Sequence, residues 1–186
     1  MSTPKLRKQD LDNSWYQPGG SWLKIRLWYF INIIVFKNPV HLGYGVKAGL
    51  LRLFGAKVGK RPIIKPGVSI KYPWRIYIGD YVSIGENVWI DNLGDVYFED
   101  QTTVSQGALL LTGNHNYKKQ SFDLIIGDIR VQEGAWIGAR CVVCPGVTCG
   151  AYSILTVGSV ATKDLAPHMI HSGNPAVTIR DRILEP

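Results

Sequence analysis

The chain has 186 residues, of which 46% are hydrophobic, so it is long enough to build one domain around a substantial core. Its net charge of +7 is uneven: residues 1–61 carry +9, whereas residues 62–186 carry −2. The basic segment suits an anionic ligand or a lipid surface, but the sequence has no RNA-binding signature and no recognition-helix pattern, which excludes nucleic acid as an expected partner.

Two helices are expected near the N-terminus. Ser21 is a candidate N-cap for a helix over residues 21–36, and a second helix within residues 46–59 ends at Gly55. The longest apolar run without a charge, residues 27–36, has ten residues. A membrane span needs about twenty residues, and no signal-peptide cleavage site follows. We therefore expect the protein to stay in the cytoplasm.

These helices have two alternative uses. Residues 1–57 are predicted to cap the open end of the repeat domain, which exposes apolar core and unpaired strand edges. The alternative is a peripheral contact of residues 1–37 with the inner face of the cytoplasmic membrane, with basic side chains at the headgroups and aromatic ones in the boundary layer. The side chains concerned are Trp22, Lys24, Arg26, Trp28, Tyr29, Phe30 and Lys37.

The central feature of the sequence is a period of six residues. Its later positions are Val131, Ile137, Val143, Cys149, Leu155 and Ala161. A period of six fits neither an α-helix nor an ordinary strand, and predicts an all-β parallel β-helix of hexapeptides over residues 58–165. Residues 166–186 are expected to form a C-terminal tail.

Before residue 111, apolar residues of the same kind come in groups of three. The step is six residues within a group and eight residues between groups. The residues are Val58, Ile64, Ile70, Ile78, Ile84, Ile90, Phe98, Val104 and Leu110. Three hexapeptides make one triangular coil, and the two extra residues enlarge its third corner. Because successive coils lie about 4.8 Å apart, we expect Leu110 to stack over Ile90, and Ile90 over Ile70.

The repeat stops at residues 111–130, a protruding loop that leaves at the enlarged corner, and resumes at Val131. Such an excursion from a regular solenoid favours a functional loop over a tolerated surface loop. Counting on from Leu110 gathers polar residues at this corner: His115 above Asp95, with Asp91 and Asn92 one coil below.

The motifs of the second half resemble those of hexapeptide-repeat acyltransferases, which acetylate sugars and antibiotics. TGNH, WIG, PGVT, GSVATKD and GNPA follow one another in that order. Together with RLFGAKVGK at 52–60 and VWIDNLG at 88–94, they are most similar to the colanic acid biosynthesis acetyltransferases. The resemblance covers nearly the whole chain. It implies a left-handed helix, a homotrimer and acetyl-CoA as co-substrate, with no metal required.

Acetyl transfer to a sugar hydroxyl requires a base, because an alcohol is a poor nucleophile at neutral pH. His115 matches the catalytic position of the family, and a histidine with an ordinary pKa near 6.5 can accept a proton in the cytosol. Its other ring nitrogen needs a partner, either a backbone carbonyl or a carboxylate such as Asp91 or Asp95.

The expected acceptor-binding residues surround this base: Asp91, Asn92, Asp95 and Tyr117. The amide of Asn92 can both donate to and accept from sugar hydroxyls. An ordinary turn is the structural alternative for residues 91–95. The other histidines, His41, His168 and His171, match no catalytic pattern.

The resemblance also implies a donor site. The backbone N–H of Ala139, directly after WIG, is the expected donor to the oxyanion. The pantetheine arm is expected to run between neighbouring subunits, and lysine and arginine suit the phosphates of coenzyme A. The implied coenzyme-binding residues are Trp136, Ala139, Val157, Thr162, Lys163 and Arg180.

The predicted function is acetyl-CoA-dependent O-acetylation of a sugar in surface-polysaccharide biosynthesis, by direct transfer. The alternatives are an O-acetyltransferase for antibiotics or other small molecules, and a non-catalytic β-helix that docks to a membrane or a partner. A covalent route through Cys141, Cys144 or Cys149 is disfavoured, because these thiols lie in the repeat without a motif partner. A carbonic anhydrase built on the same repeat needs a trio of metal-binding histidines that the sequence lacks.

Overall fold

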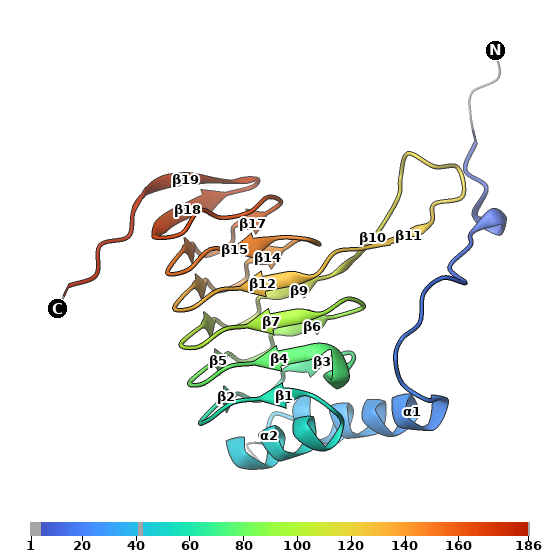
Figure 1. Ribbon diagram of the computed structural model, residues 1–186, viewed down its shortest axis with the longest axis horizontal. Coiled ribbons are helices and arrows are strands. Elements are labelled where there is room, and N and C mark those ends of the chain that lie inside the picture. The colour runs from blue at the N-terminus through green and yellow to red at the C-terminus, as the bar shows by residue number, and fades with distance from the viewer. Residues whose placement is uncertain (1–4, 41–42, 186) are drawn as a thin grey trace.

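The computed structural model describes residues 5–40 and 43–185, and shows a three-sided stack of coils above two helices (Figure 1). The helices are α1 (Trp22–Ile31), continued by the π-helical turn η2 (Asn32–Phe36), and α2 (Tyr44–Leu53). Short 3-10 turns are η1 (Lys8–Asp10) and η3 (Pro73–Arg75). No helix in the described ranges is long and apolar enough to cross a membrane. His41 lies outside those ranges.

Three parallel sheets form the sides of the stack. Face A contains β1 (Lys57–Val58), β4 (Ile76–Ile78), β7 (Val96–Phe98), β12 (Ile129–Val131) and β15 (Thr148–Cys149). Face B contains β2 (Ile63–Ile64), β5 (Ser83–Ile84), β8 (Thr103–Val104), β13 (Trp136–Ile137), β16 (Ile154–Leu155), β18 (Met169–Gly173) and the antiparallel β19 (Ala176–Asp181). Face C contains β3 (Ser69–Ile70), β6 (Trp89–Asp91), β9 (Leu109–Leu111), β14 (Val142–Val143) and β17 (Val160–Ala161).

The register confirms the predicted stacking. Leu110 pairs with Ile90, and Ile90 pairs with Ile70. Val131 pairs with Phe98, so the coil resumes where the repeat predicts. In each short strand successive side chains point to opposite sides. The repeated apolar residue points inward and is buried from Ile64 onward, whereas Val58 in the first strand is partly buried.

The C-terminal residues are not a separate tail. β18 pairs in parallel with β16 and so extends face B by one more strand. β19 then folds back antiparallel on β18. The hexapeptide period gave no sign of this ending, because the pairing of β19 does not follow the coil.

The helices cap the lower end of the stack as predicted from its open edge. Trp28, Phe36 and Leu51 are fully buried and belong to the same apolar cluster as the coils. Ser21 accepts a hydrogen bond from Lys24 N and so caps α1. Gly55 follows α2 with a φ of 101°, a conformation that suits glycine at a helix end.

Side chains of the cap also hydrogen-bond to the main chain of the lowest coil. Trp28 Nε1 donates to Ile70 O at 2.8 Å, and Asn32 Oδ1 accepts from Ile70 N at 3.2 Å. Lys47 Nζ donates to Lys65 O at 2.8 Å. The Arg52 guanidinium donates to the carbonyls of residues 58 and 59. The cap therefore supplies hydrogen-bond partners for backbone groups of the lowest coil.

The expectation of one helical cap over residues 1–57 is wrong for residues 5–20. This segment, here called the strap, runs without regular structure apart from η1, beside the stack and up to a protruding hairpin (Figure 1). Trp74 Nε1 donates to Pro18 O at 2.6 Å, and Tyr16 OH donates to Leu93 O at 3.1 Å. These contacts hold the strap against the enlarged corner between faces C and A.

Candidate active site

His115 ends the first strand of the hairpin that interrupts the coils. The hairpin pairs β10 (Gly113–His115) with β11 (Leu124–Ile126), and places His115 opposite Leu124. His115 Nδ1 lies 2.8 Å from the carbonyl oxygen of Phe122. Because a carbonyl oxygen only accepts, Nδ1 carries the proton and Nε2 is left as the acceptor. This is the tautomer that a general base of the predicted kind needs.

Phe122 has a backbone conformation that Tyr81 and Tyr152 also adopt at turns of the coils. Its φ of 57° lies in the left-handed region, which costs about 1–2 kcal/mol for residues other than glycine. Its ring stacks on His115, with centroids 4.5 Å apart and planes 9° apart. Phe122 therefore fixes the His115 ring both through its carbonyl and through its own ring.

The prediction that His115 stands above Asp95 is wrong. Ile129 pairs with Val96, and Asp95 N donates to Asp128 Oδ1 at 2.9 Å, so Asp128 occupies that place. Counting residues onward from Leu110 gives this position only if the chain continues in the coil after Leu111. Instead, it leaves the coil and pairs with its own return strand.

Both predicted carboxylates lie at the foot of the hairpin and contact cations from the coil below. Asp91 Oδ1 is 2.8 Å from Lys71 Nζ. Asp95 Oδ1 is 3.6 Å from Arg75 Nη1, and its other oxygen accepts from the Tyr97 hydroxyl at 3.2 Å. Of the two partners proposed for the ring of His115, the structure shows the backbone carbonyl rather than a carboxylate.

The prediction that Asn92 binds the acceptor is wrong, because its side chain is fully buried. Its Oδ1 accepts from Tyr72 N at 3.0 Å, while its Nδ2 donates to Tyr72 O at 2.7 Å and Arg75 O at 3.1 Å. The amide is thus used to hold the corner of the coil below. Tyr117, by contrast, is 76% exposed and lies just beyond His115 on the hairpin.

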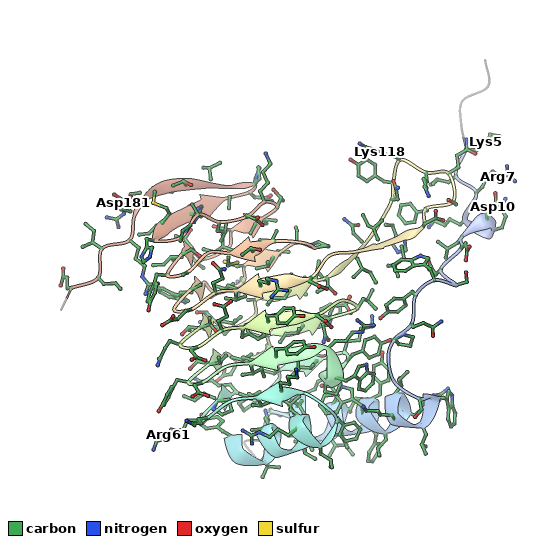
Figure 2. All side chains as sticks on the ribbon, viewed as in Figure 1. Lys5, Arg7, Asp10, Arg61, Lys118 and Asp181 are labelled. Carbon is green, nitrogen blue, oxygen red and sulfur yellow. The ribbon has the colours of Figure 1, made fainter. Side chains whose placement is uncertain are left out.

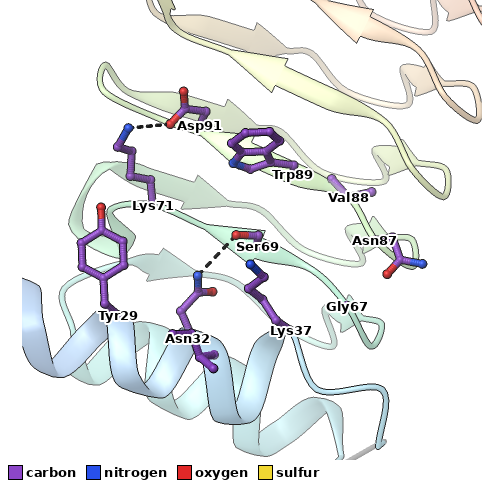
Figure 3. Close-up of a pocket in the computed structure, with 11 residues that line it drawn as sticks. Tyr29, Asn32, Lys37, Gly67, Ser69, Lys71, Asn87, Val88, Trp89 and Asp91 are labelled. Atoms are coloured by element: carbon purple, nitrogen blue, oxygen red, sulfur yellow. Dashed lines mark hydrogen bonds and ion pairs between the residues drawn. The ribbon is translucent and has the colours of Figure 1, made fainter.

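A cavity of about 440 Å³ opens between the cap and face C, with Asp91 at one end (Figure 3). Its floor includes Asn32, which donates to Ser69 Oγ at 3.3 Å. Sequence reasoning missed this cavity, because it forms where two distant segments meet. The outward position of Trp89 in its strand was the one available signal. The lining residues are Tyr29, Asn32, Ile33, Lys37, Gly67, Ser69, Lys71, Asn87, Val88, Trp89 and Asp91.

The residues predicted for the donor site lie in four places. Trp136 points outward from face B and donates from Nε1 to Ser105 Oγ at 2.8 Å. Ala139 and Val157 are in adjacent turns between faces B and C, since Gly158 N donates to Ala139 O.

Three more donor-site candidates lie farther along the chain. Thr162 and Lys163 follow β17, and therefore lie at the corner between faces C and A. Arg180 is on β19. One chain consequently places Ala139 and the His115 hairpin at opposite edges of face C.

The cysteines lack the properties of a nucleophile. Burial raises the pKa of Cys149 to about 12, and raises the pKa of Cys141 and of Cys144 as well. The thiolate, not the thiol, is the reactive form. None of these residues lies on the hairpin. Across the described ranges, no three His, Cys, Asp or Glu side chains come close enough together to hold a metal ion.

Comparison with known proteins gives the following matches, although no family model matches the chain. The protein of Escherichia coli (strain K12) named "Putative colanic acid biosynthesis acetyltransferase WcaF" is 36% identical over 165 residues, 89% of this chain and 91% of its own. Galactoside O-acetyltransferase of the same organism is 28% identical over 138 residues, 73% of this chain and 68% of its own. A solved galactoside acetyltransferase in complex with coenzyme A is 25% identical with a TM-score of 0.76, covering 87% of this chain and 82% of that one.

These matches fit the sequence motifs and the stacked coils. They confirm the predicted class, an all-β left-handed parallel β-helix of hexapeptide repeats. The match to WcaF extends over most of both chains. The chain belongs to the family of hexapeptide-repeat acetyltransferases that includes WcaF.

Proposed function

We propose that the protein transfers the acetyl group of acetyl-CoA to a hydroxyl group of a sugar used in surface-polysaccharide biosynthesis. The observation that carries this proposal is the bond between His115 Nδ1 and the Phe122 carbonyl, which leaves Nε2 free to take a proton. The name of WcaF places that relative in colanic acid biosynthesis, and another relative is named for O-acetylation of a galactoside.

The proposed reaction is a direct transfer. His115 Nε2 takes the proton of the sugar hydroxyl as its oxygen attacks the thioester carbonyl carbon. The resulting oxyanion accepts a hydrogen bond from the N–H of Ala139. When the intermediate collapses, the C–S bond breaks and the imidazolium returns its proton to the sulfur of coenzyme A. The raised pKa of the three thiols disfavours a route through an acetylated cysteine.

We also propose that the active form is a homotrimer. Faces B and C both present apolar side chains outward, such as Trp136 and Trp89. Face A presents two cations, Lys57 and Arg130, over the rings of Tyr77 and Tyr97. Because the Ala139 turn and the His115 hairpin lie at opposite edges of face C in one chain, we propose that the Ala139 turn of a neighbouring subunit completes the site. Sedimentation of an active monomer contradicts this assembly.

The proposed location is the cytoplasm, with the cap against the inner face of the membrane. Trp22 is 69% exposed, Leu23 is 67% and Phe30 is 62%, and Lys24 and Arg26 lie beside them in sequence. This surface suits an anionic interface. We expect the protein to sediment with anionic vesicles at low salt and to be released as salt rises, because charges are screened within about 10 Å at 0.1 M. No sedimentation at low salt leaves capping as the role of these helices.

The test of the function is thiol release from acetyl-CoA with a panel of sugars, namely free, nucleotide-linked and lipid-linked. Release that depends on one of these sugars, together with mass gain of that sugar by one acetyl group, supports the proposal. Release only with antibiotics places the enzyme among the small-molecule O-acetyltransferases. No release with any acceptor indicates a binding protein.

A further inference from the structure

The strap contacts the strand that pairs with His115. Asn13 Oδ1 accepts from Leu124 N at 3.1 Å, and Leu124 is the residue opposite His115 in the hairpin. Farther out, Arg7 N donates to Gln120 O at 2.8 Å. Figure 2 shows the labelled Lys5, Arg7 and Asp10 of the strap near Lys118 of the hairpin. The strap thus bonds to the side of β11 that β10 leaves free.

The strap also contacts Phe122, the residue that orients the base. The Lys8 ammonium lies 5.3 Å from the centroid of the Phe122 ring, within range of a cation–π interaction. The Phe122 ring in turn stacks on His115, and its carbonyl accepts from His115 Nδ1. A chain of contacts therefore runs from Lys8 and Asn13 to the imidazole.

The other end of the strap is fixed to the coils. Arg75 Nη2 donates to Gln17 O at 2.7 Å, and Trp74 Nε1 donates to Pro18 O. Tyr16 OH donates to Leu93 O, and burial raises the pKa of Tyr16, so its hydroxyl stays protonated as a donor. Because the strap is bonded to the coils at one end and to the hairpin at the other, it restrains the hairpin relative to the enlarged corner.

We propose that Asn13 is a positioning residue for acetyl transfer, and that the strap holds His115 in its reactive orientation. This inference rests on the proposed role of His115 as the base. A two-stranded hairpin alone is only marginally stable in water. The left-handed conformation of Phe122 needs support from its surroundings, because residues other than glycine rarely adopt it. The bond from Leu124 N to Asn13, the bond from Arg7 N to Gln120 O and the Lys8 ammonium over the Phe122 ring supply that support.

The test compares Asn13→Ala with Gln17→Ala in the full-length protein. Both variants lose an amide side chain from the strap, but the contact of Gln17 with Arg75 uses its main-chain oxygen. A misplacement of about 1 Å can cost about 10²-fold in rate, so we expect kcat of Asn13→Ala to fall about 10- to 100-fold with an unchanged KM for acetyl-CoA. Gln17→Ala should keep kcat within about twofold. Asn13→Asp keeps an acceptor oxygen for Leu124 N and should recover most of the rate.

A double-mutant cycle separates positioning from general structure. If Asn13 acts through His115, Asn13→Ala should have no further effect on kcat in the His115→Ala background. Amide exchange over residues 113–126 should become faster in Asn13→Ala, while exchange in the coils stays unchanged. Unchanged kcat in Asn13→Ala overturns the inference, and so does an equal loss in both backgrounds. Full activity of His115→Ala instead overturns the proposed base, whatever Asn13 does.

Discussion

The coils and the hairpin are held by different kinds of contact. In the inner coils a buried side chain has an equivalent neighbour above and below, as Ile90 has Leu110 and Ile70. In the hairpin each contact occurs once: one carbonyl and one ring orient His115, and one strap side chain bonds to Leu124. Stability and chemistry therefore depend on separate sets of residues, so substitutions in the two regions should affect different measurements.

The largest effect is expected from His115→Ala. This change removes the proton acceptor, and general base catalysis contributes about 10²- to 10⁴-fold in rate. We expect kcat to fall by that factor, with KM for acetyl-CoA and the Tm nearly unchanged, because His115 is absent from the apolar cluster of the core. His168→Ala is the control and should leave kcat unchanged. Near-normal turnover of His115→Ala with its true acceptor shifts the role of base to Asp91 or Asp95.

The reverse pattern is expected from Ile90→Ala in the coils. Ile90 is fully buried between two equivalent residues. Replacing a buried isoleucine by alanine costs about 2–5 kcal/mol, because it loses apolar contact and leaves a cavity. Denaturant unfolding should show this loss, while kcat per folded molecule stays the same. A fall in kcat without a loss of stability would contradict the assignment of stability to the coils and of catalysis to the hairpin.

Asn92→Ala tests the border between the regions, at the foot of the hairpin. The change leaves buried backbone groups of Tyr72 and Arg75 without partners. Each such group costs about 1–3 kcal/mol. We therefore expect a lower unfolding free energy and an unchanged KM for the acceptor. A raised KM for the acceptor with an unchanged unfolding free energy would show that Asn92 binds the acceptor after all.

The smallest effect concerns pH and His171, a buried histidine of β18. Burial lowers the pKa of His171, and its Nε2 accepts from Ala166 N at 3.2 Å. The unfolded chain therefore binds this proton more readily than the folded one. Stability should fall as pH drops below about 6.5, by at most about 1.4 kcal/mol per pH unit, and level off below the lowered pKa. Urea unfolding between pH 7 and pH 5 measures this, and His171→Gln should remove that part of the slope.

The repeated coils were predicted from the sequence, whereas most features that occur once, such as the path of the hairpin, were not. The period of six was enough for the coils, their register, and the point where Val131 resumes the stack. It also marked residues 111–130 as an excursion. The period does not predict the positions of residues within the excursion, because β10 pairs with β11 and not with the coil below.

The errors at the site have the same origin. Asp91 and Asn92 are neighbours in one motif, yet only Asp91 lines the cavity, because the corner below uses the whole amide of Asn92. The strap has no periodicity to read, and its contacts join residues far apart in sequence, such as Asn13 and Leu124. His115 was found through its motif, and its carbonyl partner was one of two expected kinds.

The bonds from the cap to the lowest coil also bear on how the protein avoids self-association. Trp28, Asn32, Lys47 and Arg52 bond to main-chain groups of that coil. Without them the first strands of all three faces would form a flat, open edge, which is a template for another chain's strands. Coils are stackable by construction, so a molecule stripped of its cap could add copies end to end into fibres with the spacing of amyloid. The helices thus prevent further chains from adding to the lowest coil.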